Sequence, residues 1–181
     1  QGQSIGDGDR FLEQGETAEL TFALQNAAPL YPPPATDVQI AVTTADASVT
    51  IAGGGQQSVA LLPPGASFEC APVVLQLNSS AADHWVILNI DVTSNGGNVT
   101  FHYSMEFTLG TPHLLIVEDD PTSDVEHYVR DVVRSQERIY ERATLSAGQS
   151  LAPEWYPQYG MVLWLSGNDS GNVLTTQDQA Q

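Results

Sequence analysis

The sequence has very few positively charged side chains. Its 181 residues include five arginines and no lysine against 22 aspartates and glutamates, which gives a formal net charge of −17. A surface with this excess of carboxylates repels nucleic acids and anionic membranes, and it attracts divalent cations. The composition therefore excludes nucleic-acid binding from the candidate functions.

Long apolar runs and paired cysteines are also missing. No stretch of about 18 apolar residues occurs, so we expect no membrane span. Cys70 is the single cysteine, which rules out an internal disulfide, and its place on an expected strand predicts a buried apolar role. The chain opens at Gln1 on polar residues without a signal peptide, as expected of a mature or excised fragment.

The first 109 residues are expected to form strands. Within residues 17–26, Leu20, Phe22 and Leu24 occupy alternate positions, which places them on one face of a strand. Similar segments follow between proline- and glycine-rich turns, and an Asn-Gly-Gly sequence at residues 95–97 joins the two longest in a predicted hairpin. This spacing predicts an antiparallel immunoglobulin-like β-sandwich over residues 1–109.

After residue 109 the pattern changes to that of a parallel α/β unit. Residues 113–117 and 161–165 are continuous apolar runs, typical of strands buried on both faces. Between them, residues 124–136 have helical spacing, and a further strand follows at 138–143. We therefore expect a partial flavodoxin-like module over residues 110–181. One helix covers one face of such a sheet, so a partner or further residues are expected to cover Trp164 and its neighbours.

Asp119 and Asp120, which follow the first apolar run, resemble the acidic pair of a bacterial receiver domain. That interpretation needs a phosphoacceptor aspartate at the end of the third strand and a lysine further along the chain. Trp164 and Leu165 stand at the end of the third strand, and the chain has no lysine. The sequence therefore excludes a phosphorelay role, and we expect no catalytic residue.

Carboxylates also crowd into residues 6–16, where Asp7, Asp9, Glu13 and Glu16 are interspersed with glycines. Calcium binds about six to eight oxygens from carboxylates and carbonyls, and a glycine-rich loop can fold around it. The spacing does not match an EF-hand. These four residues are the candidate metal ligands and calcium is the expected ion, with a solvated acidic turn as the alternative.

The segment GDGDRFLEQGETAELTFALQNAA, residues 6–28, joins an acidic, glycine-rich turn to a first strand, and LLPPGAS, residues 61–67, adds a proline-glycine turn. Both resemble the immunoglobulin-like accessory domains of large secreted bacterial surface proteins and peptidases. In that family the acidic turn is sometimes a calcium site, which the resemblance implies for Asp7, Asp9 and Glu16. The strands and turns of residues 113–171 resemble the flavodoxin-like or amidotransferase-like module that often follows.

The resemblance implies an extracellular or cell-surface setting in bacteria. The preferred function is a non-catalytic segment that acts in adhesion, spacing or surface assembly through a protein partner or self-association. The alternative is an accessory region of a secreted, peptidase-type hydrolase whose catalytic domain lies elsewhere.

A carbohydrate-binding module is a weaker third interpretation, with Trp85 and Tyr103 as candidate platforms. Alternation places Phe101, Tyr103 and Met105 on one face of their strand, and we expect that face to lie in the core. A buried Tyr103 would not be available to a sugar, which is why the sequence favours this interpretation least.

Overall fold

The computed structural model describes residues 3–5, 11–27, 33–118, 125–146 and 149–166. The chain divides into two compact units, Gln1–Gly110 and Thr111–Gln181. The first consists of antiparallel β-sheets and the second of a small parallel sheet with one α-helix among its described residues. Each unit is described by itself below.

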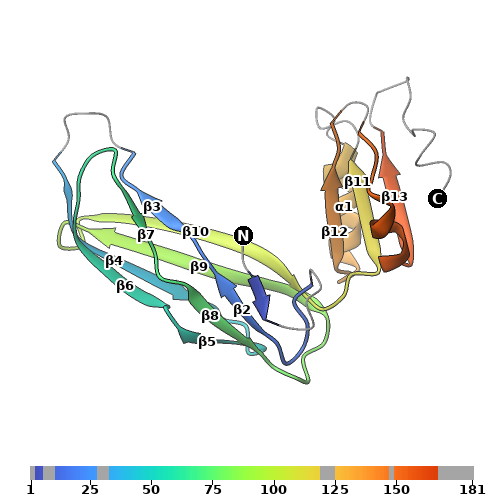
Figure 1. Cartoon of the computed structure of the whole chain (residues 1–181), viewed down its shortest axis with the longest axis horizontal. Coiled ribbons are helices and arrows are strands. Elements are labelled where there is room, and N and C mark those ends of the chain that lie inside the picture. Colours follow the sequence, from blue (N-terminus) through green and yellow to red (C-terminus); the bar gives the residue numbers. More distant parts are fainter. Residues whose placement is uncertain (1–2, 6–10, 28–32, 119–124, 147–148, 167–181) are drawn as a thin grey trace. The chain divides into compact units, whose positions relative to one another are not determined.

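Two four-stranded antiparallel sheets form the first unit (Figure 1). One has the order β1-β2-β8-β5, with β1 Gln3–Ile5, β2 Thr17–Leu20, β8 Val73–Leu77 and β5 Val49–Gly53. The other has the order β10-β9-β4-β6, with β10 Val99–Leu109, β9 His84–Ser94, β4 Ala35–Thr43 and β6 Gln56–Leu62. A two-stranded sheet pairs β3, Ala23–Gln25, with β7, Ser67–Glu69.

The two larger sheets share one hydrophobic core. Alternate residues of β4 and β9 supply one side of it and alternate residues of β8 the other; they are Val38, Ile40, Val42, Val86, Leu88, Ile90, Val73, Leu75 and Leu77. Cys70 belongs to the same cluster as a free, buried thiol, as predicted, and this burial raises the pKa of the thiol. A single core of this kind explains why period-two alternation dominates the first half of the sequence.

Residues 17–26 form two strands where one was expected. Strand β2 pairs with β8 and β3 pairs with β7, and the two pairings are separated at Thr21 and Phe22. The partner strands are interrupted at the same level, between Cys70 and Pro72, where the proline nitrogen has no hydrogen to donate to a ladder. Leu20, Phe22 and Leu24 nevertheless pack against the core, so the predicted face was right.

The predicted hairpin joins β9 to β10. Asn95, Gly96 and Gly97 all have positive φ values, of 54°, 67° and 85°, and Asn and Gly are the residues that tolerate this conformation best. The Asn95 side chain also ties the turn to β4, because its Oδ1 accepts hydrogen bonds from Thr36 N at 2.9 Å and Thr36 Oγ1 at 3.1 Å.

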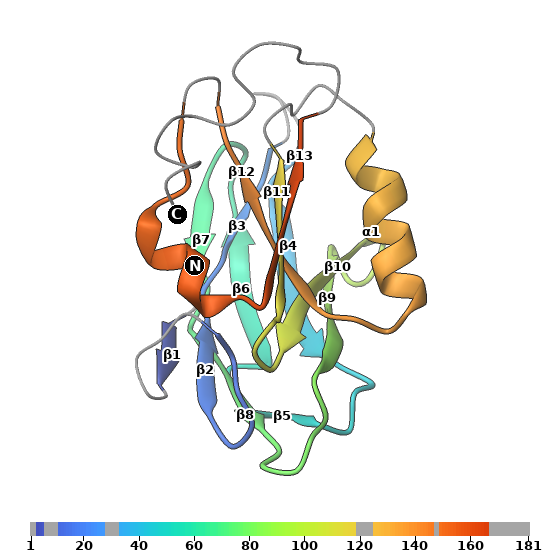
Figure 2. The same cartoon turned by 90° about the vertical axis from the view of Figure 1, so that its right-hand side faces the viewer.

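In the second unit, three parallel strands have the order β12-β11-β13, with β11 Leu114–Glu118, β12 Tyr140–Thr144 and β13 Met161–Leu165. The predicted parallel pairing of residues 113–117 with 161–165 is confirmed in the pairing of β11 with β13. Helix α1, Val125–Ser135, lies on one side of the sheet, and the 3-10 helix η1, Pro153–Gln158, lies on the other (Figure 2).

The sequence predicted that a partner or further residues would be needed to cover one face of this sheet, but its central strand is buried within the chain itself. Leu115, Ile116 and Val117 of the central strand are fully buried, although their side chains point alternately to opposite faces. Trp164 is partly buried, and Met161 is the one strongly exposed residue of β13. The segment that follows β12, with buried Leu151 and Tyr159, supplies the second cover that sequence periodicity did not predict. No helix of the described residues has the length and hydropathy needed to cross a membrane.

Candidate functional site

The hairpin of β9 and β10 presents two different faces. Val86, Leu88 and Ile90 point into the core, so Trp85, Ile87 and Asn89 point outward from the sheet. The register pairs Glu106 with Ile87 and Ser104 with Asn89, which places all of these on the same outer face. The outer face therefore carries the apolar side chains of Trp85 and Ile87, with Glu106 opposite Ile87, and continues into a polar end.

The polar end is a continuous row of hydrogen-bonded side chains. His102 Nδ1 lies 2.7 Å from Asp91 Oδ1, and His102 Nε2 lies 3.1 Å from Ser104 Oγ. Ser104 Oγ in turn donates to Asn89 Oδ1 at 2.8 Å. These four residues form two directly opposed cross-strand pairs, Asp91 with His102 and Asn89 with Ser104. We call them the polar row.

The polar row contains an Asp-His-Ser sequence of contacts, the arrangement that activates a serine nucleophile. Its geometry argues against that role. The Ser104 hydroxyl directs its proton at Asn89, so His102 has no proton to accept from it. The side chains of His102 and Asp91 are also 59% and 49% exposed, and surrounding water weakens the electrostatic effect of such a contact on its neighbours. The row is a fixed polar surface.

A shallow groove of about 920 Å³ runs over this outer face and reaches Tyr103 and Met105 of the edge strand β10. Residues of β9, β10 and the turn after β4 line it, among them Asp46, Trp85, Ile87, Asn89, Ser104 and Glu106. Its lining contains two carboxylates and no arginine or histidine. The groove therefore suits a ligand that carries no negative charge.

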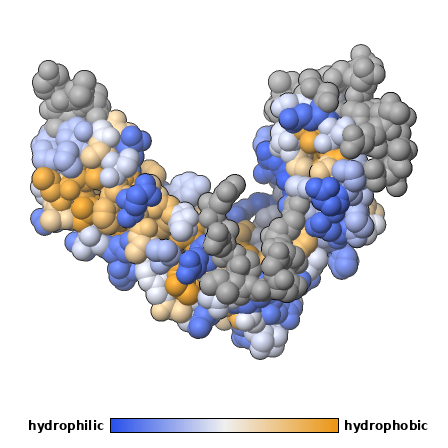
Figure 3. Space-filling view, in the orientation of Figure 1, coloured by the Kyte–Doolittle hydropathy of each residue, from blue (hydrophilic) through white to orange (hydrophobic). Residues whose placement is uncertain are grey.

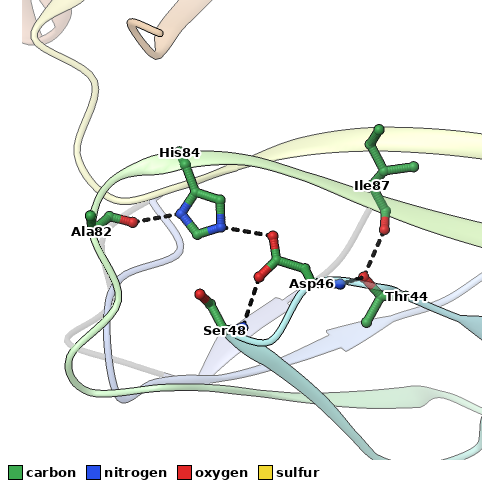
Figure 4. A network of polar contacts seen from close by, with 6 residues as sticks. All are labelled: Thr44, Asp46, Ser48, Ala82, His84 and Ile87. Carbon is green, nitrogen blue, oxygen red and sulfur yellow. Dashed lines mark hydrogen bonds and ion pairs between the residues drawn. The ribbon is translucent and has the colours of Figure 1, made fainter.

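Asp46 at the end of this groove is held by His84, the first residue of β9 (Figure 4). His84 Nε2 lies 2.8 Å from Asp46 Oδ2, and His84 Nδ1 lies 2.6 Å from the carbonyl of Ala82. Both ring nitrogens thus face acceptors, which only the protonated imidazolium satisfies. Burial alone lowers the pKa of His84, but these two hydrogen bonds and the attraction of Asp46 outweigh it and raise that pKa.

The pKa of Asp46 is shifted in the direction that favours the same ion pair. Burial alone raises the pKa of this carboxyl, but the hydrogen bond from the Ser48 amide, at 2.7 Å, and the contact with His84 outweigh it and lower that pKa. Thr44 completes the turn, since its Oγ1 donates to the Ile87 carbonyl at 2.8 Å and accepts from the Asp46 amide (Figure 4). The network fixes the turn after β4 against the start of β9.

The inner face of β10 is exposed along its first half, contrary to the sequence-based expectation. Val99, Phe101 and Tyr103 are 52%, 60% and 53% exposed, although the register places Phe101 opposite Val92 on the core side. Strand β10 is the edge of its sheet, and the described strands of the facing sheets do not bury this part of it. The prediction that Tyr103 lies in the core was therefore wrong.

Beside this exposed strand lies an apolar groove of about 230 Å³, lined by residues of β3, β4 and the hairpin, including Leu24, Val38, Val92 and Val99. Figure 3 shows hydrophobic residues gathered at this end of the first unit. An open sheet edge and an apolar groove thus occur together.

The predicted calcium ligands lie partly outside the described residues. Nothing is described of Asp7 and Asp9, so calcium binding stays a prediction. Glu16 Oε2 accepts a hydrogen bond from the Glu13 amide at 2.8 Å, which shows that these two predicted ligands lie close together. Within the described part of the chain, no three histidine, cysteine, aspartate or glutamate side chains are grouped to hold a metal.

Asp119 and Asp120 also lie outside the described residues, but Glu118 just before them is described. This carboxylate is 4% exposed and lies 3.4 Å from Arg142 Nε on the neighbouring strand β12. Thr144 Oγ1 donates to it at 3.2 Å. Arg142 thus neutralises a buried acid at the carboxyl end of the sheet.

The polar row and the Asp46–His84 pair were not predicted from sequence. The signal for the polar row was present, because counting outward from the Asn-Gly-Gly turn pairs Asp91 with His102 and Asn89 with Ser104. No comparable signal pairs His84 with Asp46, which are 38 residues apart and meet only when β4 and β9 lie side by side.

No protein-family model and no curated protein matches this sequence. Among solved structures, an ASH/PapD-like domain of human CEP192 is 14% identical over 55% of this chain and 74% of that chain, with a TM-score of 0.33. A 2,6-sialyltransferase of Photobacterium sp. is 12% identical over 86% of this chain, which covers 28% of the enzyme, with a TM-score of 0.30. At these TM-scores neither likeness bears on function.

Proposed function

We propose that this chain is a non-catalytic assembly segment of a secreted or cell-surface bacterial protein, and that β10 is the strand through which two copies associate. In this proposal the first unit is an immunoglobulin-like β-sandwich and the second a partial flavodoxin-like module. The strand order β12-β11-β13, with the first strand of the unit in the centre, supports the second assignment.

The observation that carries the proposal is the combination of an open edge and exposed apolar side chains on β10. An edge strand offers unpaired amides and carbonyls to a further strand, and proteins usually protect such edges with charges, prolines or bulges. The 11-residue strand β10 has none of these between Val99 and Met105. The edge is therefore open to strand addition.

The distribution of charge supports a second copy as the occupant. The chain as a whole carries a formal charge of −17, which opposes contact between most parts of two copies. Residues 99–105, in contrast, contain no aspartate, glutamate or arginine. Antiparallel pairing of two β10 strands over this segment would bury Phe101 of both copies and bring no like charges directly opposite one another.

The test is the oligomeric state of the wild-type chain and of a Val99→Asp/Phe101→Asp double variant. We expect a dimer for the wild type by sedimentation over about 1–100 μM, because each half-exposed side chain contributes on the order of 1 kcal/mol when covered. The double variant should be monomeric, since two added carboxylates per copy would face each other.

Tyr128→Asp is the matched control, because Tyr128 is 74% exposed on α1. It adds one carboxylate per copy, half the charge of the double variant, at a more exposed aromatic position and should leave the dimer intact. A wild-type chain that stays monomeric throughout this range would contradict the proposal and favour the accessory region of a secreted hydrolase.

A further inference from the structure

We propose that the outer face of β9 and β10 binds a neutral oligosaccharide. This inference goes beyond the proposed assembly through β10, because the groove lining includes neither Val99 nor Phe101. The groove on this face places Trp85 and Ile87 at one end and the polar side chains of Asn89 and Ser104 next to them.

The apolar and the polar side chains of the groove match the apolar and the polar surfaces of a pyranose ring. The C–H groups of a sugar form an apolar face that lies against aromatic or aliphatic side chains, here Trp85 and the 47% exposed Ile87. The hydroxyl groups around the ring need donors and acceptors at fixed positions. Asn89, Ser104 and Glu106 supply amide, hydroxyl and carboxylate groups on the same face.

The polar groups are held in place before a ligand arrives. Asn89 Oδ1 accepts from Ser104, and His102 lies against both Ser104 and Asp91, so each side chain of the polar row fixes its neighbour. The Asn89 Nδ2 hydrogens make no hydrogen bond within the described residues, which leaves them as donors for a hydroxyl. Side chains that are already ordered lose less entropy on binding, which favours the bound state.

The charge and the volume of the groove restrict the class of ligand further. Asp46 and Glu106 are the charged residues of the groove lining, so sugars with carboxylate or sulfate groups are repelled. The volume of about 920 Å³ lies near the upper end of small-ligand sites, which typically span roughly 300–1,000 Å³. The groove therefore suits several linked sugar residues more than one.

The experiment is a titration of the full chain with neutral hexasaccharides of glucose and of N-acetylglucosamine, and with an oligogalacturonate as the anionic counterpart. Calorimetry gives the affinity, and amide chemical shifts show which strands respond. We expect a neutral oligosaccharide to bind with a dissociation constant below about 1 mM. Its shift changes should concentrate on β9 and β10, and the anionic sugar should bind at least about 10-fold more weakly.

Two variants test the groove itself. Ile87→Ala and Asn89→Ala should each weaken binding by about 10-fold, because one removes the apolar contact and the other the amide donors. Ile87 is exposed and Asn89 lies on the outer face, so both variants should fold. Trp85→Ala should abolish binding, with chemical shifts elsewhere in the first unit reporting that its fold is retained.

Tyr128→Ala on α1 controls for non-specific contact with an exposed aromatic ring and should bind like the wild type. Phe101→Asp, which disrupts the proposed dimer from the inner face, should also retain sugar binding, so the two proposals fail independently. The inference is overturned if no neutral sugar binds at about 10 mM, if Ile87→Ala and Asn89→Ala bind like the wild type, or if the anionic sugar binds equally well.

Discussion

Strands β9 and β10 have the same length and belong to one hairpin, yet they differ in almost every measure of burial. Both contain 11 residues, and in both the side chains point alternately to the two faces of the sheet. In β9, Val86, Leu88 and Ile90 are buried, whereas the first half of β10 is exposed at every position. The difference lies in their neighbours, because β9 is flanked by β4 and β10, and β10 is an edge.

The comparison separates two pieces of information that alternation is often taken to give together. Alternation fixes which side chains share a face, and the register confirms this for both strands. Burial of that face depends on whether another sheet lies over it. Two strands with the same alternation of side chains can therefore differ in burial, one as a core strand and the other as a binding strand.

The largest expected effect follows from the cross-strand pair Ile90 and Tyr103, which lie directly opposite on the same face. Ile90 is 8% exposed and Tyr103 is 53% exposed. Ile90→Ala should lower the free energy of unfolding of the first unit by about 2–5 kcal/mol, because it leaves a cavity in the core. Tyr103→Ala should lower it by less than about 1 kcal/mol.

Urea unfolding followed by circular dichroism measures both variants, and an unchanged m-value shows that the same surface is exposed in each. Equal losses for the two substitutions would mean that β10 is as well covered as β9, which would remove the basis for strand addition.

The same distinction explains how far the sequence predicted the structure. Period-two alternation, the Asn-Gly-Gly turn and the apolar runs at 113–117 and 161–165 located strands and the hairpin, because these are local properties. The exposure of Phe101 and the cover over Leu115 were missed, since both depend on strand order and on segments far apart in the chain. The strand break near Phe22 was missed for the same reason.

The candidate sites also differ in whether local sequence could predict them. The polar row could be found by counting from the hairpin, whereas the ion pairs of Asp46 with His84 and of Glu118 with Arg142 required strand pairings that the sequence does not encode locally. The calcium prediction rests on local spacing and falls largely outside the described residues.

A smaller effect is expected at the hairpin turn, where Asn95 ties the β9 end of the hairpin to β4. Asn95→Ala should cost about 1–3 kcal/mol, because Ala both removes the acceptor for Thr36 and disfavours a φ of 54°. Asn95→Gly removes the acceptor but tolerates the positive φ, so the difference between the two variants isolates the backbone strain, on the order of 1 kcal/mol.

Asn98→Ala in the same turn is the control for this pair. Its side-chain amide donates to the Asn95 carbonyl at an exposed position and to no other group in the described part of the chain, and its loss should stay within about 0.5 kcal/mol. Thermal unfolding of the three variants gives the comparison. An Asn95→Gly variant as stable as the wild type would show that the contact with Thr36 contributes nothing to the anchoring of β9.

The smallest expected effect is a dependence of stability on pH that arises at the start of β9. His84 at the start of β9 pairs with Asp46, and their side chains are 33% and 18% exposed, whereas His102 on β10 pairs with Asp91 in the open. The folded state raises the pKa of His84, so its contribution is complete below the ordinary value of about 6.5. That contribution is lost as pH rises through the folded-state pKa.

Asp46 sets the lower limit of this window. Its folded-state pKa is lowered, so its contribution is present above the ordinary value of 3.8 and is lost as pH falls through the folded-state pKa. The pair therefore stabilises the first unit most between about pH 4 and 6.5, by an amount on the order of 1 kcal/mol or less, as for other partly exposed ion pairs. Melting temperatures of the wild type and of His84→Gln should differ most in this range and converge as pH rises through the folded-state pKa of His84. A His84→Gln variant that keeps the full pH dependence of the wild type would show that the start of β9 is not held by this ion pair.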